Sequence, residues 1–537
     1  MAGYVPLPGS KCQLLPNSRP AGPIDPSALD SITVRVRSSG DFGELEKRVY
    51  EQSKLPLSDR TYLTRDALAR QYGASDEDLD LVEHFAQQHN LMVVHRSAAE
   101  CLIVLSGRLG DLLNAFPSDL RIYHHAGGTY RGRLGEISIP EALGNVITGV
   151  FGFDTRPKQR SSHRQLLMAS AGPGGRNGVA ATDYAKRYNF PTKFQGVTLD
   201  GTGQTVAIIE LGGGFRASDL SVFFREIGVP LPLVSAISVD RAGNKPTTAN
   251  SADGEVMLDI EVAGAVAPKA KFAVYFAPNT NKGFMDAISA AVHDTQRKPS
   301  AISISWGGPE SASDLQSINS FHQVFVAAAA VGVTICAAAG DHGTADMASQ
   351  DWDKKIHVDH PAVDDLVLGC GGTQINAAGK DEVWNDGTPF DINAPGGGGW
   401  ATGGGVSTLI AAPSYQAGAR VPVSIDTGKP GRGVPDIAMS ATNYFSRVDS
   451  SEGASGGTSA VAPLMAALVV LLNQAKKKNV GFLNPFLYAN VAKGVAHDVT
   501  SGTNAIANTV KGYNAGAGWD ACTGLGTPDG TAILNSL

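Results

Sequence analysis

Ser459 has the sequence setting of a nucleophile. It lies in the glycine-rich segment Gly456–Ala460, directly before the apolar stretch Val461–Leu472. This order places the serine hydroxyl where a turn gives way to a helix. There the free backbone N–H groups and the positive end of the helix dipole favour developing negative charge. A serine in this position suits acyl transfer, provided that a base can reach its hydroxyl.

Two carboxylates on a predicted helix are the candidates for that base. Glu255 and Asp259 are spaced i and i+4 in the segment 253–265, whose apolar residues recur with a helical period and which ends before Pro268. The helix therefore stacks both carboxyl groups on one face. Because neighbouring carboxyls cannot both ionise cheaply, they share a proton and one pKa rises. Glu255 would then be a base for Ser459 at mildly acid pH, oriented by Asp259; the alternative is an ordinary solvated helix face.

Asp341 is a third acidic candidate. It follows the apolar run Ile335–Gly340, and an aspartate in such a position commonly stabilises a turn. As a protonated acid it would instead donate a hydrogen bond to an oxyanion, which requires low pH or a raised pKa. The residues alone leave both roles open.

The composition is that of a globular protein and excludes several classes. Hydrophobic residues make up 42% of the 537 residues and only 18% are charged, which fits compact domains and argues against disorder. A net charge of −7 without a basic run gives no surface for nucleic acid. The five cysteines are scattered without metal-type spacing. No apolar stretch of about 18 residues predicts a membrane span, and residues 1–20 lack the apolar core of a secretion signal.

Four regions differ in sequence pattern. Residues 1–30 are rich in Pro and Ser and predict a tail, whereas residues 31–157 alternate strand and helix patterns and predict an α+β domain. Residues 158–180 are basic, Ser- and Gly-rich and aperiodic, which predicts an exposed linker of the kind that proteases cut. Residues 181–537 form the fourth region. In the second region we expect strands at Ile32–Val36 and Leu102–Leu105 and helices near Asp76–His89 and Leu109–Phe116.

The fourth region alternates apolar β-branched runs with helical segments. Strands without polar alternation are buried on both faces, which predicts an α/β domain with a mostly parallel sheet flanked by helices. Glu210, Trp306 and Asp341 follow or end three of these runs beside glycines, and active sites of open α/β sheets gather at that edge. The expected strands are 206–209, 272–276, 301–305, 333–335 and 366–368.

The chain resembles the sedolisins, the serine-carboxyl peptidase family, and among them the kumamolisins. Several motifs occur together in the family's order, and the resemblance spans nearly everything from about residue 31 to residue 537. The matching segments are Ile208–Gly214, the Glu255 helix, Ser303–Glu310, Ala338–Asp341 and Gly457–Pro463.

This resemblance implies a subtilisin-like catalytic domain and suggests a role for each site residue. The implied triad and oxyanion donor are Ser459, Glu255 and Asp259, with Asp341. In kumamolisins a Glu and a Trp extend the hydrogen-bond network, and the matching residues are Glu210 and Trp306. Without the resemblance, a strand-end Glu and a core Trp would be the simpler interpretation.

The resemblance also implies a zymogen. Residues 31–157 correspond to the family's propeptide, a ferredoxin-like α+β domain that assists folding, covers the active-site cleft and inhibits the enzyme within the same chain. The linker 158–180 then becomes the activation segment, and the mature enzyme should begin between about Leu166 and Ala181. Further expectations are protein or peptide substrates, a secreted monomer, and no nucleic-acid or membrane partner.

Glycine-rich loops near the C-terminus offer a metal site. Asp498, Val499 and the segment Gly516–Asp520 put two carboxylates beside backbone carbonyls, and calcium prefers such oxygen ligands in flexible loops. From spacing alone, a solvated loop is equally favoured. The resemblance implies one structural Ca²⁺, bound by the side chains of Asp498 and Asp520 and by the carbonyls of Val499, Gly516 and Gly518.

A histidine beside Asp341 suggests an alternative triad. His342 stands where kumamolisins commonly carry Ser, and a Ser459–His342 pair would give a subtilisin-type Ser-His-Asp peptidase. Against it, His342 follows the strand expected to carry the oxyanion donor, and the Glu255 helix fills the position where subtilisins keep their triad His.

Two other classes are weaker alternatives. Gly453–Gly457 fits the G-x-S-x-G pattern of an esterase, with Ser455 as nucleophile and His497 downstream, but the polar residues 449–452 precede it where a nucleophile elbow needs an apolar strand. A catalytically inert calcium-binding relative is the other class. It would be favoured by loss of a triad residue, and none is missing.

Overall fold

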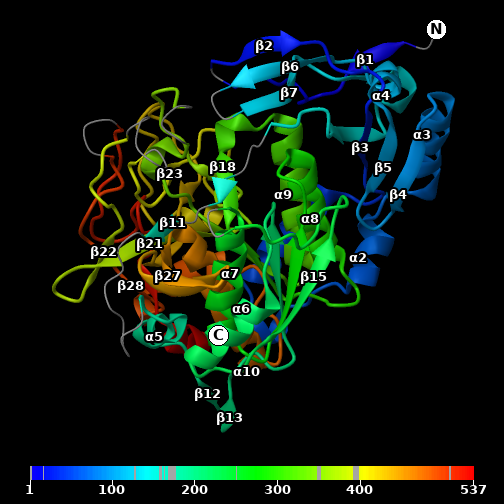
Figure 1. Ribbon diagram of the computed structural model, residues 1–537. Coiled ribbons are helices and arrows are strands. Elements are labelled where there is room, and N and C mark those ends of the chain that lie inside the picture. The colour runs from blue at the N-terminus through cyan, green and yellow to red at the C-terminus, as the bar shows by residue number, and fades with distance from the viewer. Residues whose placement is uncertain are drawn as a thin grey trace.

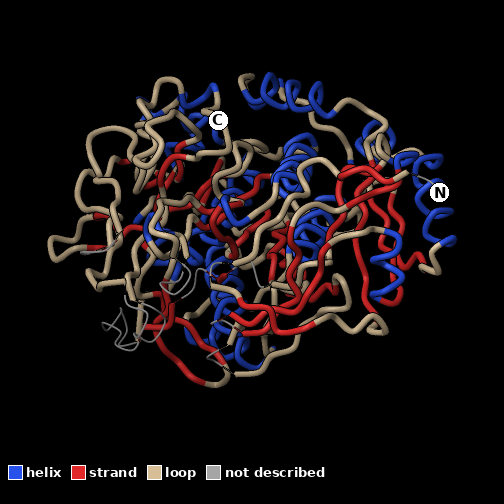
Figure 2. The backbone as a smooth tube through the Cα atoms, turned by 90° about the horizontal axis from the view of Figure 1, so that it is seen from above, coloured by secondary structure: helices blue, strands red, loops and turns tan. Residues whose placement is uncertain are grey.

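The computed structural model describes nearly the whole chain and divides it into two domains joined by a segment near residue 160 (Figure 1). The smaller, N-terminal domain lies at one end of the molecule, and the N-terminus belongs to it, while the C-terminus belongs to the larger domain (Figure 2). The residues described are 3–15, 17–125, 128–156, 160–161, 164–166, 177–248, 251–347, 352–390, 398–506 and 510–537.

The N-terminal domain is built on a four-stranded antiparallel sheet in the order β4-β5-β3-β9. Leu79, Val82 and Ala86 lie on one stripe of α3 and are buried against the sheet's core, as the helical spacing predicts. The α+β expectation is therefore confirmed. The elements are β3 (Leu29–Val36), α3 (Asp76–Gln88), β4 (Met92–Ser97), β5 (Leu102–Arg108), α4 (Leu109–Ala115) and β9 (Ile147–Phe151).

The prediction of a tail at residues 1–30 is wrong. Strand β1 (Tyr4–Pro6) pairs with β8 (Ser138–Pro140), and β2 (Arg19–Gly22) pairs with β6 (Asp119–His125). Strand β6 also pairs with β7 (Gly128–Leu134). These short, mostly exposed strands are held by backbone hydrogen bonds, so they carry no hydrophobic alternation for a sequence pattern to reveal.

The C-terminal domain contains an eight-stranded, mostly parallel sheet, as predicted. Its order is β15-β16-β14-β17-β19-β21-β22, with β25 also paired to β21, and β22 is its antiparallel strand. Strand β21 begins later than the expected 366–368. The strands are β14 (Thr205–Glu210), β15 (Leu233–Ser238), β16 (Lys271–Phe276), β17 (Ala301–Ile304), β19 (Thr334–Ala338), β21 (Leu368–Ile375), β22 (Asp381–Val383) and β25 (Ile437–Ser440).

Helices cover both faces of this sheet. Along β14, Ile208 packs into the core under α7 and α10, whereas its neighbour Ile209 packs into the core under α8 and α9. Alternate residues therefore serve two cores, which is why the strands are apolar throughout. The helices are α7 (Asp253–Val266), α8 (Asn281–His293), α9 (Leu315–Ala330) and α10 (Val461–Lys476).

Helix α10 also corrects the prediction that no stretch reaches the length of a membrane span. Thr458–Lys476 is long and apolar enough by length and composition, and 89% of that window is buried inside the domain. The helix runs past Leu472 to Lys476, further than the apolar run alone suggests.

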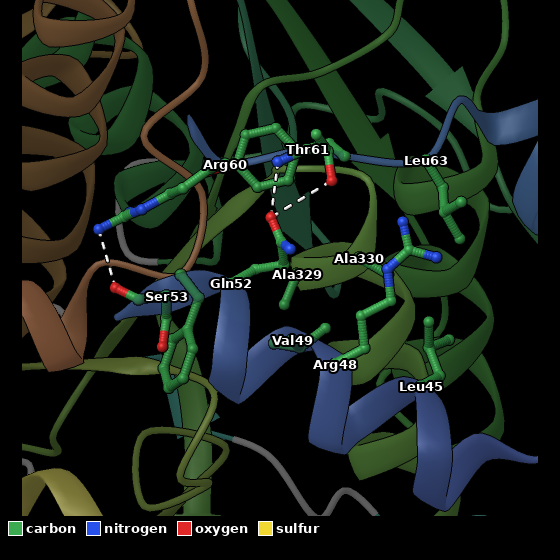
Figure 3. Close-up of a pocket in the computed structure, with 12 residues that line it drawn as sticks. Leu45, Arg48, Val49, Gln52, Ser53, Arg60, Thr61, Leu63, Ala329 and Ala330 are labelled. Carbon is green, nitrogen blue, oxygen red and sulfur yellow. Dashed lines mark hydrogen bonds between the residues drawn. The ribbon is translucent and has the colours of Figure 1, made fainter. Parts of the chain in front are cut away.

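The N-terminal domain docks on α9 through helix α1 (Phe42–Ser53) and the segment 60–63. Figure 3 shows Leu45, Val49 and Gln52 of α1 facing Ala329 and Ala330 at the end of α9. The segment is tied down by its backbone, since Leu63 donates to the carbonyl of Ala330 (2.9 Å). Arg60 donates to the carbonyl of Val480 (2.9 Å) in the C-terminal domain.

A buried ion pair joins the two domains at the other end of α9. The Arg133 guanidinium lies 2.9 Å from the Asp314 carboxylate, and both side chains are about 95% buried. Asp314 also caps α9, accepting from the backbone N–H of Ser317 (3.0 Å). Gly9 adds a backbone contact, since its carbonyl accepts from the N–H of Gln316 (3.1 Å), so the expected tail takes part in the interface.

The linker crosses the C-terminal domain as two short strands. β10 (Arg160–Ser161) pairs antiparallel with β18 (Trp306–Pro309), and β11 (Arg164–Leu166) pairs antiparallel with β27 (Ser451–Gly456). Much of the predicted linker, including residues 167–176 of the expected start of the mature enzyme, lies outside the described residues.

Replacing Arg133 by Ala is expected to lower the melting temperature of the full chain by several degrees. Asp314 would remain buried without its counter-ion, and breaking such a pair costs about 3–5 kcal/mol. Arg121→Ala is the control, because the Arg121–Asp119 pair is half exposed and contributes little. Equal melting temperatures for the two variants in a thermal denaturation series would contradict this role for the pair.

Candidate active site

The candidate nucleophile sits at the start of the central helix. Gly457, with φ of +113°, turns the chain from β27 into a single 3₁₀ turn, Thr458–Ala460, which leads directly into α10. A positive φ of this kind suits glycine. Ser459 is fully buried in this form of the chain, and its hydroxyl donates to the carbonyl of Ser305 (3.3 Å).

Glu255 and Asp259 lie together beneath this serine. Both are completely buried on α7, and the solvated helix face considered from sequence is therefore excluded. Burial and the nearby Asp259, Glu210 and Asp341 carboxyls raise the pKa of Glu255 well above its usual range, while the Ser459 hydroxyl acts in the opposite direction. Burial raises the pKa of Asp259 to about 8 although Ser305 and Glu255 lower it. The pair therefore holds protons far above the usual carboxyl range.

Glu210 and Trp306 extend this acidic cluster, as the resemblance implied. Glu210 ends β14 and is fully buried, and its Oε2 accepts a hydrogen bond from the Trp306 indole N–H (2.9 Å). Burial and the Asp259 carboxyl raise the pKa of Glu210 well above its usual range. Three carboxyl groups thus share one dry region under the serine.

Ser305 is a site residue that sequence reasoning missed. It follows β17 directly, and its hydroxyl lies 2.8 Å and 2.9 Å from the two oxygens of Asp259 and 3.3 Å from the carbonyl of Ser459. Its carbonyl in turn accepts from the Ser459 hydroxyl. The available signal was its place at the carboxyl end of a buried strand beside Trp306, the edge where sites of such sheets gather.

Asp341 lies on the other side of the serine and is 4% exposed. Its Oδ1 accepts from both the backbone N–H and the hydroxyl of Thr458, each at 2.8 Å. Because Oδ1 is the acceptor of both bonds, a proton on this carboxyl resides on Oδ2. The Thr458 contacts fix Asp341 against the residue that precedes the nucleophile, which suits a donor aimed at an oxyanion.

The candidate base Glu255 and the candidate nucleophile Ser459 are neighbours without a formed hydrogen bond. Neither oxygen of Glu255 has a hydrogen-bond partner among the described residues, while the Ser459 hydroxyl points to the carbonyl of Ser305. Catalytic hydrogen bonds are often incomplete before substrate binds. A rotation of the Ser459 side chain would turn its hydroxyl from Ser305 toward Glu255.

The comparisons with known proteins agree on one family. Residues 16–156 match the Pro-kumamolisin, activation domain model. Kumamolisin from Bacillus sp. (strain MN-32) is 45% identical over 547 residues, covering 99% of this chain and 96% of that protein. Sedolisin from Pseudomonas sp. (strain 101) is 26% identical, covering 93% and 85%. The structure of Pseudomonas sedolisin complexed with two molecules of pseudo-iodotyrostatin superposes with a TM-score of 0.56 at 27% identity, covering 67% of this chain and 98% of that chain.

The chain belongs to the sedolisin family of serine-carboxyl peptidases. As a member of that family it is a serine peptidase. Its N-terminal domain is a pro-kumamolisin activation domain, hence an intramolecular inhibitory propeptide. The matched region begins at residue 16, so part of the expected tail belongs to the propeptide of this sedolisin.

The alternative triad with His342 finds no support in this sedolisin's geometry. The His342 ring packs against Trp400, with centroids 4.7 Å apart, and against Phe390 at 6.0 Å. The Ser459 hydroxyl is instead directed to Ser305. His342 therefore belongs to an aromatic cluster beside Asp341.

The serine of the esterase pattern, Ser455, lies in a strand. Ser455 lies inside β27 rather than on a turn before a helix, and its hydroxyl shares a hydrogen bond with that of Ser446 (2.7 Å). His497 is exposed and lies 3.4 Å from Asp529. Neither residue joins the carboxylate cluster of this sedolisin.

The candidate calcium residues come together in the C-terminal loops. The backbone N–H of Gly518 donates to Asp498 Oδ2 (2.8 Å), and the N–H of Gly516 approaches Asp520 Oδ2 (3.4 Å). Burial raises the pKa of Asp520. Within the described residues no lysine or arginine forms an ion pair with Asp498 or Asp520, so neither carboxylate is balanced by a basic side chain there. This donor set, with the carbonyl of Val499 adjacent, fits Ca²⁺.

Replacing Asp259 by Asn is expected to flatten the pH dependence of stability. The pKa of Asp259 is raised in the folded chain to about 8, so its stabilising contribution is complete below the unfolded value near 4 and is lost as pH rises toward 8, at up to about 1.4 kcal/mol per pH unit. We expect the melting temperature of the Ser459→Ala chain to fall over this range, and that of Ser459→Ala/Asp259→Asn to fall less. Parallel curves from pH 4 to 8 would show that Asp259 titrates normally.

Proposed function

We propose that this sedolisin is an endopeptidase that cleaves proteins at acid pH through Ser459, Glu255 and Asp259. The observation that carries the proposal is the buried carboxylate pair directly beneath the buried serine. Asp341 completes the arrangement as the donor to the oxyanion.

The proposed reaction moves one proton between Ser459 and Glu255. Glu255 takes the hydroxyl proton as Ser459 Oγ attacks the substrate carbonyl, and Asp341 Oδ2–H donates to the oxygen that becomes negative. Glu255 then gives the proton to the leaving amine, and the acyl-enzyme forms. Water repeats the sequence in the second half of the reaction, with Glu255 again as base. Asp259, held by Ser305, orients Glu255 and keeps the proton that the pair shares.

Acid conditions follow from two protonation requirements. Asp341 donates only as a carboxylic acid, and the Glu255–Asp259 pair works with one proton between them. The acid form of Asp341 is favoured at low pH, whereas the one-proton state of the pair requires an ionised Glu255 and therefore sets the acid limit of the activity. At high pH, ionising both Glu255 and Asp259 would place two negative charges in a cluster without water, which is costly. Asp341 would also be ionised and would no longer donate a hydrogen bond.

The chain is also proposed to be a secreted zymogen that activates itself. The linker strands β10 and β11 pair with β18 and β27 on either side of Ser459, as a peptide substrate bound along the cleft would. Ser161 pairs with Trp306, the residue after Ser305, and Arg164 pairs with Gly456, three residues before Ser459. Membership of the family supports secretion, and a monomer is the simplest state for a chain that carries its own inhibitor.

The C-terminal loops are proposed to bind one structural Ca²⁺. Asp498 and Asp520 would hold it through their carboxylates, with the carbonyls of Val499, Gly516 and Gly518. The ion would balance two carboxylates that form no ion pair with the lysines and arginines that the structure describes, and it would connect the loops at 498–499 and 516–520.

The catalytic proposal is tested by a pH–activity profile on denatured protein. We expect an acid maximum, no cleavage of substrate or linker by Ser459→Ala, and a kcat about 10²–10⁴-fold lower for Glu255→Gln. Glu261→Gln is the matched control: Glu261 is equally buried on the same helix, but it accepts from the backbone of Arg447. A maximum at neutral or alkaline pH, or similar losses for the two Gln variants, would refute the carboxylate mechanism.

Calcium removal should lower the melting temperature of the Ser459→Ala chain. A ligand bound only to the folded state contributes about 2.7 kcal/mol at a concentration of 100 times its Kd. Re-added Ca²⁺ should restore the original value, and Asp498→Asn should respond to neither treatment. A chelator effect that persists in Asp498→Asn would place the ion elsewhere.

A further inference from the structure

A second cluster of metal-ligating groups lies far from Ser459 in sequence, beneath helix α1 of the propeptide. His322 projects from α9, and Asp364 and Asp365 come from the loop before β21. His322 Nδ1 is 2.9 Å from Asp364 Oδ2 and 3.6 Å from Asp365 Oδ1, and the three residues each offer a ligand atom within 4.8 Å of the other two. These residues play no part in the proposed reaction.

The spacing of these atoms fits a tetrahedral ion. Zn²⁺ binds imidazole nitrogen and carboxylate oxygen at about 2.0–2.2 Å, which sets ligand atoms about 3.3 Å apart at the corners of a tetrahedron. The two measured separations from Nδ1 bracket that value. An ion could be accommodated with small side-chain movements.

Each ligand is oriented by a partner on its far side. Asp364 Oδ1 accepts from the backbone N–H of Leu366 (3.0 Å), and Asp365 Oδ2 accepts from the Tyr50 hydroxyl. His322 Nε2 faces the Glu46 carboxylate at 3.5 Å. A proton on Nε2 shared with Glu46 leaves the Nδ1 lone pair free to bind a metal, the arrangement that carboxylate–histidine–metal sites use. Glu46 and Tyr50 both belong to the propeptide.

Charge and access also favour a cation. The carboxylates of Glu46, Asp364 and Asp365 outnumber the imidazole of His322. Burial lowers the pKa of the neighbouring His360 to about 4, and Arg432 is engaged with Asp436 (2.7 Å). The side chains of His322 and Asp365 are 27% and 16% exposed, so an ion has a route from solvent. Imidazole with two carboxylates is a donor set for first-row transition metals rather than for calcium.

We propose that His322, Asp364 and Asp365 form a binding site for a divalent transition-metal ion such as Zn²⁺, with a water as fourth ligand. Glu46 and Tyr50 of the propeptide orient the ligands without touching the ion. The site is therefore best formed in the zymogen and loses its two orienting partners when the propeptide leaves.

A proton on His322 is the competing occupant. Burial disfavours the charged imidazole, but Asp364, Asp365 and Glu46 outweigh it and raise the pKa of His322 to about 11. Proton and metal exclude one another at Nδ1. The ion must therefore displace that proton, and direct binding distinguishes the two occupants.

The test is a titration of the Ser459→Ala full chain with Co²⁺ at neutral pH in excess Ca²⁺, followed by the visible absorption of tetrahedral Co²⁺. We expect one such ion per chain, at least tenfold weaker binding for His322→Ala and for Asp365→Asn, and a 10–100-fold loss for Glu46→Gln. Excess Zn²⁺ should remove the absorption. A melting curve of each variant verifies that it is folded.

His84→Ala is the control, since His84 is exposed on α3 and its Nδ1 lies 2.7 Å from the carbonyl of Asp80 on the same helix. It should bind Co²⁺ like the parent. Absence of the tetrahedral spectrum in the parent, or equal binding by the parent and by folded His322→Ala and Asp365→Asn, would overturn the proposal and leave His322 with a proton only.

Discussion

The site depends on the exclusion of water from carboxyl groups. Glu210, Glu255 and Asp259 are all fully buried, and burial is the largest cause of the raised pKa of each. A buried carboxyl is tolerated when it holds a proton or accepts hydrogen bonds. In this cluster Trp306 donates a hydrogen bond to Glu210, and Ser305 donates one to Asp259. Glu255, the proposed base, accepts none from the described residues, which leaves it the most available member of the cluster for the Ser459 proton.

This constraint explains how the surrounding elements are arranged. Helix α7 carries Glu255 and Asp259 through the middle of the core, so it is buried on all sides and packs against α5 (Ala181–Arg187), α6 (Ala217–Glu226) and α10. The donors come from the carboxyl ends of buried strands, whose backbone is fixed by pairing on both edges. Rigid strand ends hold Glu210 and Ser305 to positions that a mobile loop would not maintain.

Sequence patterns predicted the proposed reactive residues better than the residues that position them. Glu255 and Asp259 were found because helical spacing puts i and i+4 on one face, and Ser459 because glycines precede an apolar helix. The same helical pattern predicted too little burial for α7. An apolar stripe predicts one buried face, whereas this helix is buried on all sides. Ser305 escaped because a serine after a strand has no distinctive pattern; its role arises only when β17 is placed beside α7. The roles of Glu210, Trp306 and the calcium residues came from the resemblance rather than from spacing.

The strands of residues 4–6 and 19–22 show a different limit. They are held by backbone pairing to segments more than 90 residues away. Side-chain periodicity does not predict which distant strand will be the partner. The cross-domain contacts share this property: Gly9 meets Gln316 through backbone atoms alone, and His322 acquires Glu46 only when the propeptide docks. The contacts between the propeptide and the catalytic domain are thus the ones that a linear sequence reveals least. The proposed catalytic acids Glu255 and Asp259 lie on a single helix, and for that reason their spacing could be recognised directly in the sequence.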